Sequence, residues 1–244
     1  MSSLKATLIL ENGSVLSGTS IGSTETRVCE LVFNTSMTGY QEILTDPSYA
    51  GQGVVMSYPL IGNYGVNSED NESSRPWVEM LVVRHLSPRG SNFRREMDLG
   101  DYMKEHDIPG IEGVDTRALT KLLRSQGSMN AMLTCAQQFD VGQVLERLHA
   151  YKVRDTIQKV TRSAPEEFPA IGEERYHVAM MDYGVKQNMI DCLRRRGCSV
   201  TALPASTPAE TVLSGGYDGV LLSNGPGDPA ENTDMIREIK KLYD

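Results

Sequence analysis

The chain has few of the residues that mark metal centres and disulfide scaffolds. Its 244 residues include only four cysteines and four histidines. The cysteines form no Cys-x-x-Cys pair, and the histidines stand singly, without the spacing of metal ligands. Disulfide frameworks belong mainly to short secreted chains, and no signal peptide is recognisable here. We therefore expect free thiols, no bound metal and a cytoplasmic location.

The sequence also has no excess of basic residues and no long apolar run. It contains 24 Lys and Arg against 32 Asp and Glu, for a net charge of −8. Surfaces that bind nucleic acid or anionic membranes need a basic patch, so both classes of partner are disfavoured. No apolar stretch approaches the roughly 20 residues of a membrane-spanning helix.

The first half of the chain has the pattern of a mixed α/β domain. Asn12-Gly13 lies between apolar runs at Thr7–Leu10 and Ser14–Leu16, which is typical of a β-hairpin. Further strands are expected at Glu30–Phe33, Gly53–Ser57 and Val78–Val83, and helices at Leu99–His106, Arg117–Arg124 and Val141–Tyr151. Asp115 or Thr116 would cap the second helix, and Gly127 would end it.

The second half alternates strands and helices. A polar, proline-containing stretch at 152–176 is the expected linker between a domain at 1–151 and a domain at 177–244. Strands are expected at His177–Met181, Cys198–Leu203 and Gly219–Ser223, each followed by a helix, at Val185–Arg196, Pro208–Leu213 and Thr233–Leu242. This alternation predicts a parallel sheet with helices on its faces.

The loop Asn224-Gly-Pro-Gly-Asp-Pro229 follows the third of these strands, where ligands bind in open α/β sheets. It could be an ordinary tight turn. It could instead hold a dinucleotide, because Gly225-x-Gly227-x-x-Ala230 matches the fingerprint, although two prolines remove donors that a pyrophosphate would need. As a third interpretation, glycine N–H groups in a proline-stiffened loop suit a carboxylate or a developing oxyanion.

Several segments together resemble the small, glutamine-hydrolysing subunit of carbamoyl-phosphate synthetase, a family of class I glutamine amidotransferases. The resemblance runs over nearly the whole chain and supports the third interpretation of the loop. Its longest block, Val32–Tyr49, is peculiar to this subunit, whereas the loop at 224–229 is shared more widely among amidotransferases. The segments are Val32–Tyr49, Tyr58–Gly65, Ser91–Arg94, Val114–Thr120, Asp182–Lys186 and Leu222–Pro229.

The resemblance implies a fold and a site. An N-terminal mixed α/β domain would dock on the large subunit, and the first half of a flavodoxin-like amidotransferase domain would follow. Ser48, Gly225 and Gly227 match residues that hold glutamine in the family, with the Gly225 N–H facing the oxyanion. From the residues alone, Ser48 is better explained as a turn residue. ATP and Mg²⁺ would bind the large subunit, which uses the released ammonia for arginine and pyrimidine synthesis.

The chain departs from the family at the catalytic centre. The family's nucleophile lies in a Gly-x-Cys-x-Gly-His turn after the next strand, and no such turn occurs up to Asp244. Cys192 lies within an expected helix and Cys198 begins a strand, so neither has the exposed turn and base that a nucleophile needs. We expect a truncated copy with no catalytic residues and no glutaminase activity. The alternatives are a non-catalytic docking module for the large subunit and, less favoured, a nicotinamide-cofactor enzyme.

The short βα series has a structural consequence as well. A parallel sheet is normally covered on both faces and continued at its edges. We expect three βα units alone to leave a strand edge and apolar helix faces uncovered, which would make the second domain marginally stable. The first domain is expected to fold independently.

Overall fold

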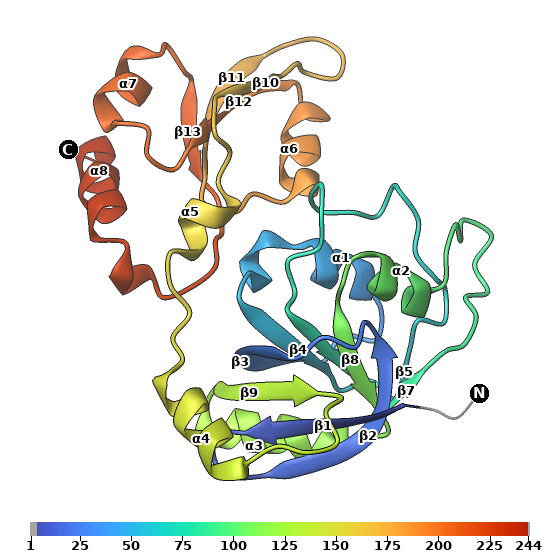
Figure 1. Ribbon diagram of the computed structural model, residues 1–244. Helices are drawn as coiled ribbons and strands as arrows, with labels where there is room; N and C mark the ends of the chain where they lie inside the picture. The colour runs from blue at the N-terminus through green and yellow to red at the C-terminus, as the bar shows by residue number, and fades with distance from the viewer. Residues whose placement is uncertain (1–3, 244) are drawn as a thin grey trace. The chain divides into compact units, whose positions relative to one another are not determined.

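The protein is described here by a computed structural model that covers residues 4–243 and forms two compact units (Figure 1). The first unit is Met1–Thr45 with Gly51–Val153, and the second is Asp46–Ala50 with Arg154–Asp244. The five residues Asp46–Ala50 therefore belong to the second unit, although they lie within the sequence of the first. Within residues 4–243, no helix combines the length and apolar character needed to cross a membrane.

A closed seven-stranded barrel forms the first unit, in the order β1-β2-β8-β6-β4-β3-β9. Its four neighbouring strands β3, β4, β6 and β8 are parallel, and the other pairs are antiparallel. The predicted hairpin is confirmed, since β1 and β2 pair across a turn at Glu11–Ser14. The strands are β1 (Lys5–Leu10), β2 (Val15–Gly22), β3 (Arg27–Asn34), β4 (Gln52–Met56), β6 (Met80–Val82), β8 (Pro109–Glu112) and β9 (Met129–Thr134).

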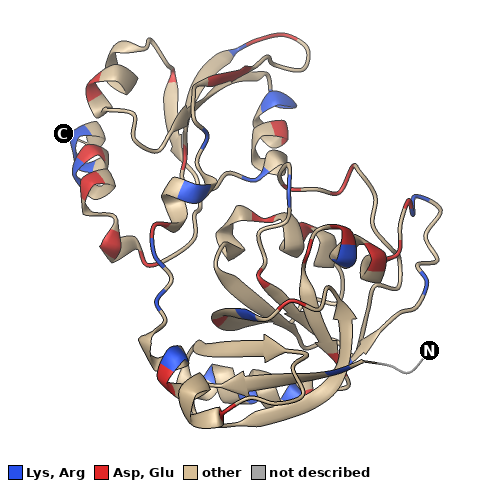
Figure 2. Ribbon diagram, in the orientation of Figure 1, with Lys and Arg blue, Asp and Glu red and all other residues tan. Residues whose placement is uncertain are grey.

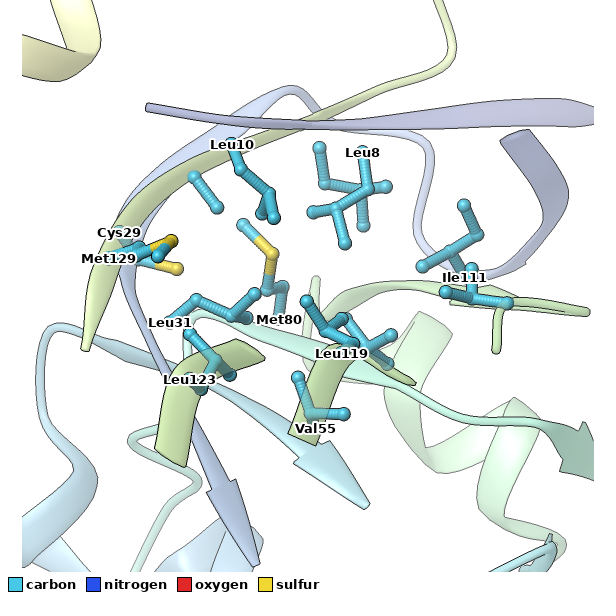
Figure 3. Packing of buried hydrophobic residues seen from close by; sticks show 14 of the residues in the cluster. Leu8, Leu10, Cys29, Leu31, Val55, Met80, Ile111, Leu119, Leu123 and Met129 are labelled. Atoms are coloured by element: carbon cyan, nitrogen blue, oxygen red, sulfur yellow. The ribbon is translucent and has the colours of Figure 1, made fainter. Parts of the chain in front are cut away.

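The barrel interior is filled by apolar side chains from most of its strands and from one helix. Leu8, Leu31 and Val55 are fully buried, and they pack with Leu119 and Leu123 of α3 (Thr116–Gln126) (Figure 3). These two leucines are four residues apart, so they lie on the same face of the helix. Burial of this face fixes α3 against the barrel.

Helix α3 begins and ends where the sequence predicts. The Asp115 carboxylate accepts a hydrogen bond from the Ala118 N–H at 3.0 Å, and Gly127 ends the helix with a φ of 91°. A side chain is disfavoured at that φ, so glycine suits the position. The other elements of this unit are α1 (Tyr40–Thr45), α2 (Leu99–Glu105), α4 (Val141–Ala150) and the short parallel pair β5 (Leu60–Ile61) and β7 (His85–Leu86).

A four-stranded sheet in the order β10-β12-β11-β13 forms the second unit. The central strand β11 is parallel to β12 and β13, as predicted, and β10 is antiparallel to β12. The strands are β10 (Glu166–Phe168), β11 (Tyr176–Asp182), β12 (Cys198–Pro204) and β13 (Gly219–Leu222), and the helices are α5 (Thr156–Val160), α6 (Gln187–Arg194), α7 (Ala209–Ser214) and α8 (Thr233–Tyr243).

Helices cover both faces of this sheet because successive residues of β11 point to opposite sides. Met180 packs with Ile190 of α6, whereas Met181 belongs to a cluster with Val212 of α7 and Met235 of α8. The predicted fold class is thereby confirmed: a mixed α/β first unit and a parallel-stranded α/β second unit.

The β13 edge of the sheet is uncovered within the described residues. In the described part of the chain this strand pairs only with β11, and Val220 and Leu222 are 43% and 39% exposed. No residue of α8 is buried, although its apolar face lies against the sheet. Within residues 4–243, β13 thus has one unpaired edge and α8 an incompletely covered apolar face, and the low stability expected of this unit stays a prediction.

Part of the stretch 152–176, expected as a linker, is built into the second unit. Ile157 of α5 belongs to the core cluster under α7 and α8, and β10 pairs with β12 from Glu166↔Ala202 to Phe168↔Val200. The stretch is polar and has no sustained periodicity, which is why the sequence indicated a linker. Its contacts come from segments more than 20 residues away, and such contacts leave no local pattern.

Candidate functional site

The loop at 224–229 leaves the carboxyl end of β13 and is joined to the turn that follows β11. The Tyr183 N–H donates a hydrogen bond to the Ser223 hydroxyl at 2.9 Å. That hydroxyl in turn donates to the Asn224 carbonyl at 2.8 Å. A single serine thus joins the ends of two neighbouring parallel strands, at the edge where α/β sheets bind ligands.

The glycines of the loop are required by close backbone contacts. A Cβ added at Gly225 would collide with the Tyr183 carbonyl oxygen, and one at Gly227 would collide with the Thr156 hydroxyl. Gly227 also has a φ of 79°, which side chains rarely adopt. Within the described residues, the N–H groups of both glycines donate no hydrogen bond, and both residues are exposed. Two exposed residues with unpaired backbone donors therefore lie on a loop that cannot easily rearrange.

A buried ion pair holds the neighbouring turn, Asp182–Gly184. One oxygen of the Asp182 carboxylate accepts the N–H groups of Gly184 and Val185 at 3.0 and 2.9 Å. The other oxygen accepts the N–H and the Nε of Arg162 at 3.0 and 2.9 Å. Asp182 is 2% exposed, and all its contacts are charge-assisted. The turn therefore presents the Tyr183 carbonyl to Gly225 in a fixed position.

Ser48 lies beside this loop. It occupies a 3₁₀ turn, Pro47–Tyr49, in the short segment that belongs to the second unit. Its hydroxyl accepts a hydrogen bond from the Asn224 side-chain amide, and its N–H donates to the Asp46 carboxylate at 2.9 Å. The Lys186 ammonium lies 3.7 Å from the same carboxylate. Two of the segments predicted to hold glutamine are thus in contact, although 176 residues separate them.

One polar atom of the Asn224 side chain has no hydrogen-bond partner within the described residues. This atom, the side-chain oxygen, is buried. An unpaired buried oxygen costs free energy, so most such atoms have a partner in folded proteins. The amide is held on its nitrogen side only, which leaves the oxygen available to a donor from outside the described residues.

An apolar cavity of about 170 Å³ lies between the loop and α8. Its walls come mainly from the loop backbone and from apolar side chains, including Ile157, Met235 and Ile239. Tyr183 also lines it, and burial raises the pKa of its phenol, so this group stays protonated at neutral pH. The cavity has few polar partners, so it suits an apolar group rather than a charged ligand.

Comparisons with known proteins cover both units. Residues 8–133 match the family model described as "Carbamoyl-phosphate synthase small chain, CPSase domain". Residues 179–244 match the model "Glutamine amidotransferase class-I". The first match alone spans more than half of the chain. The chain belongs to the carbamoyl-phosphate synthase small chain family.

Individual relatives agree over nearly the whole sequence. The chain is 46% identical over 239 residues to the carbamoyl phosphate synthase small chain of Clostridium perfringens, and 43% identical over 239 residues to that of Bacillus thuringiensis subsp. konkukian. These alignments cover 98% of this chain but 67% and 64% of the two relatives. The chain therefore spans about two thirds of the length of the relatives it matches.

The family resemblance drawn from the sequence is confirmed, but the binding roles of Ser48, Gly225 and Gly227 stay predictions. Sequence reasoning missed three neighbouring residues: Asp46, Asp182 and Lys186 hold the predicted residues in place. The signal was present for Asp182, which stands at the end of an apolar strand and directly before Tyr-Gly. Asp46 is the residue before Pro47, a position that favours a side-chain cap of a short turn.

None of the thiols in this second unit is arranged as an amidotransferase nucleophile. Cys198 is buried at the start of β12, at the opposite edge of the sheet from the loop. Cys192 lies on α6, where a hydrogen bond from Arg195, at 3.6 Å from the sulfur, lowers the pKa of the thiol. Neither thiol contacts a histidine, and no cluster of metal-ligating side chains occurs within residues 4–243.

Proposed function

We propose that this chain provides the glutamine-binding part of the small subunit of a glutamine-dependent carbamoyl-phosphate synthase. The whole protein would hydrolyse glutamine and deliver ammonia to a large subunit that carries ATP, Mg²⁺ and bicarbonate. Carbamoyl phosphate would then enter arginine and pyrimidine synthesis. The observation that supports this most directly is the contact between Ser48 and Asn224, which joins the predicted serine to the glycine loop.

The loop offers groups that suit a glutamine substrate. Gly225 and Gly227 are exposed residues whose N–H groups are unpaired within the described residues, so these groups suit a carboxylate or the oxyanion that forms during amide hydrolysis. Pro226 and Pro229 restrict the backbone of the loop. The Tyr183 carbonyl, in the turn that begins at Asp182, packs closely against Gly225. The donors are therefore oriented before the substrate arrives, which lowers the cost of binding.

We also propose a second role, because residues 8–133 match the small-chain CPSase-domain model separately from the amidotransferase match. The chain would then dock on the large subunit without supplying ammonia. Purified together with a large subunit, it would support carbamoyl phosphate synthesis from ammonia but not from glutamine. Glutamine-dependent synthesis by the 244-residue chain would contradict this role and the expected lack of glutaminase activity.

The binding proposal is tested by titrating the isotope-labelled 244-residue chain with L-glutamine and following the amide resonances. The resonances of Gly225 and Gly227 should shift in a saturable manner, and D-glutamine should shift them less. Ser48→Ala should weaken the binding by about tenfold, the factor that corresponds to one well-placed hydrogen bond. The control is Ser214→Ala, an exposed serine on α7, which should leave the titration unchanged.

Two results would contradict the proposal. One is an absence of saturable shifts at the loop in a chain whose spectrum shows a folded second unit. The other is a similar weakening by both serine variants, because that would trace the effect to general destabilisation.

A further inference from the structure

A cavity of about 630 Å³ opens at one end of the barrel in the first unit. It lies where the four parallel strands end: Thr35 directly follows β3, Ser57 directly follows β4, and Arg84 is the second residue after β6. Helix α3, which follows β8, supplies the remaining wall. The carboxyl ends of parallel strands and the helix that follows them are the usual place for a ligand in α/β folds. The lining residues are Thr35, Ser57, Tyr58, Pro59, Arg84, His85, Asp115, Thr116, Arg117, Thr120 and Lys121.

The lining is basic, although the chain as a whole is acidic. Arg84, Arg117 and Lys121 contribute three positive charges, and Asp115 is the one acidic residue of the lining. The Asp115 carboxylate caps α3 through the Ala118 N–H and offsets one of the three charges, so the lining keeps a net positive charge. Lys and Arg recur along α3 in Figure 2.

The three cations have no ion-pair partner among the described residues. Arg84 makes a single long hydrogen bond, 3.4 Å from its Nη1 to the Gly113 carbonyl oxygen. Neither Arg117 nor Lys121 forms an ion pair within residues 4–243. Arg117 and Lys121 are four residues apart on one helix, where like charges repel each other. An arrangement of this kind is stabilised when an anion binds between the charges.

Polar uncharged groups surround the cations. The side chains of Thr35 and Ser57 add hydroxyl donors, and the Thr120 hydroxyl oxygen is buried without a hydrogen-bond partner in the described part of the chain. The first turn of α3, an 11-residue helix, also faces the cavity and contributes the positive end of its dipole. Hydroxyls, guanidinium groups and a helix start together form a set that recognises oxyanions.

We propose that this cavity binds a small oxyanion, a metabolite carrying a phosphate or carboxylate group. Its volume lies in the range of small-molecule sites, about 300–1,000 Å³. Arg84 and Arg117 can each bind two oxygens of the anion, and Lys121 adds a point charge. The cavity lies wholly within the first unit, so the proposal is independent of glutamine binding by the second.

The test is calorimetric titration of the 244-residue chain with two probes, inorganic phosphate and citrate, at low ionic strength. We expect saturable binding of at least one probe at one site per chain, weakening as salt is added. Tighter binding of phosphate would indicate a phosphorylated metabolite, and tighter binding of citrate a carboxylate. Resonances of Thr35 and Ser57 should shift on binding, because they line the cavity and belong to segments other than α3.

Three matched variants on α3 localise the site. Arg117→Gln and Lys121→Gln should each weaken binding by about tenfold, since a charge-assisted hydrogen bond contributes roughly that factor. Arg124→Gln removes an equal charge from the same helix outside the lining, and it should leave binding unchanged. All three side chains are exposed, so the thermal midpoints should agree.

The proposal is overturned if neither probe binds saturably, or if Arg124→Gln weakens binding as much as the other two variants. It is also overturned if Arg117→Gln and Lys121→Gln abolish co-purification with a large subunit while the wild-type chain binds no probe. That result would assign the basic surface to a protein partner instead.

Discussion

The two units differ in how their sheets end. In the barrel, each of the seven strands has two hydrogen-bonded neighbours, because β9 pairs with both β1 and β3. In the second unit the sheet is open, and β13 has a neighbour on one side only within the described residues. The barrel encloses its apolar side chains almost completely, whereas Val220 and Leu222 of β13 remain substantially exposed. Apolar residues stabilise a fold only to the extent that the strands around them exclude water.

A helix of each unit shows the same difference in burial. Leu119 and Leu123 of α3 are 3% exposed against the barrel, whereas α8 has the same amphipathic pattern and no buried residue. Segments with few buried contacts open more readily than enclosed ones. We therefore expect the barrel to carry most of the stability of the chain and β13 with α8 to open first.

The largest expected effect comes from cutting a side chain inside the closed barrel. Leu31→Ala should lower the free energy of unfolding by about 2–5 kcal/mol, because it removes apolar contacts and leaves a cavity. Leu222→Ala, the same change on β13, should cost less than about 1 kcal/mol, since Leu222 is already 39% exposed. Urea denaturation followed by circular dichroism measures both. Equal losses would show that the open edge is covered in solution.

A comparably large effect is expected in the second unit, and it should be confined there. Asp182→Ala removes the carboxylate that accepts the Gly184 and Val185 N–H groups and leaves Arg162 paired only with the exposed Glu166. Breaking a largely buried pair in this way costs about 3 kcal/mol. The amide resonances of Gly184 and Gly225 should change, while those of the barrel stay in place. Asp191→Ala, which removes an ion pair with Arg194 on α6, serves as the control and should cost well under 1 kcal/mol. A loss of barrel structure in Asp182→Ala would contradict the independence of the two units.

Most elements of the second unit were predictable from the sequence, and closure of the barrel was not. Alternating strands and helices are local patterns, so β11, β12 and β13 lie where the sequence indicated. Strand β9 reads Met-Asn-Ala-Met-Leu-Thr and β8 starts with Pro-Gly, neither of which has the usual residues of a strand. Their strand conformation is imposed by pairing with distant neighbours, such as Leu8 of β1 with Leu133 of β9.

The candidate site also has one part that the sequence predicts and one part that it does not. The glycine loop was predictable from its position after an apolar strand. Its contact with Ser48 could not be derived from local pattern, because the two segments are 176 residues apart, and only the family resemblance connected them. Taken alone, Ser48 indicated a turn residue, and it does lie in a turn capped by Asp46. The turn interpretation is therefore confirmed, and the glutamine-binding role of this serine stays a prediction.

A moderate effect is expected on self-association. An exposed apolar strand with a free edge can pair with another chain, and a lysine at the edge opposes this. Leu222→Lys should raise the concentration at which the chain stays monomeric, as measured by light scattering after size-exclusion chromatography. Val15→Lys is the matched control, because Val15 is 47% exposed on β2 but its strand has two neighbours in the barrel. An equal improvement in both variants would indicate an effect of charge alone.

The smallest expected effect is on thiol reactivity, which compares the units without altering the fold. Cys29 is fully buried in the barrel, and desolvation raises the pKa of its thiol; the Arg195 hydrogen bond lowers the pKa of Cys192. At neutral pH more of Cys192 is thiolate, so iodoacetamide should label it before Cys29, as read by mass spectrometry of digested samples. Arg195→Gln should slow labelling of Cys192 and leave Cys29 unchanged. If Cys29 reacted as fast as Cys192 without denaturant, the barrel would have to open more readily than its closed strand order implies.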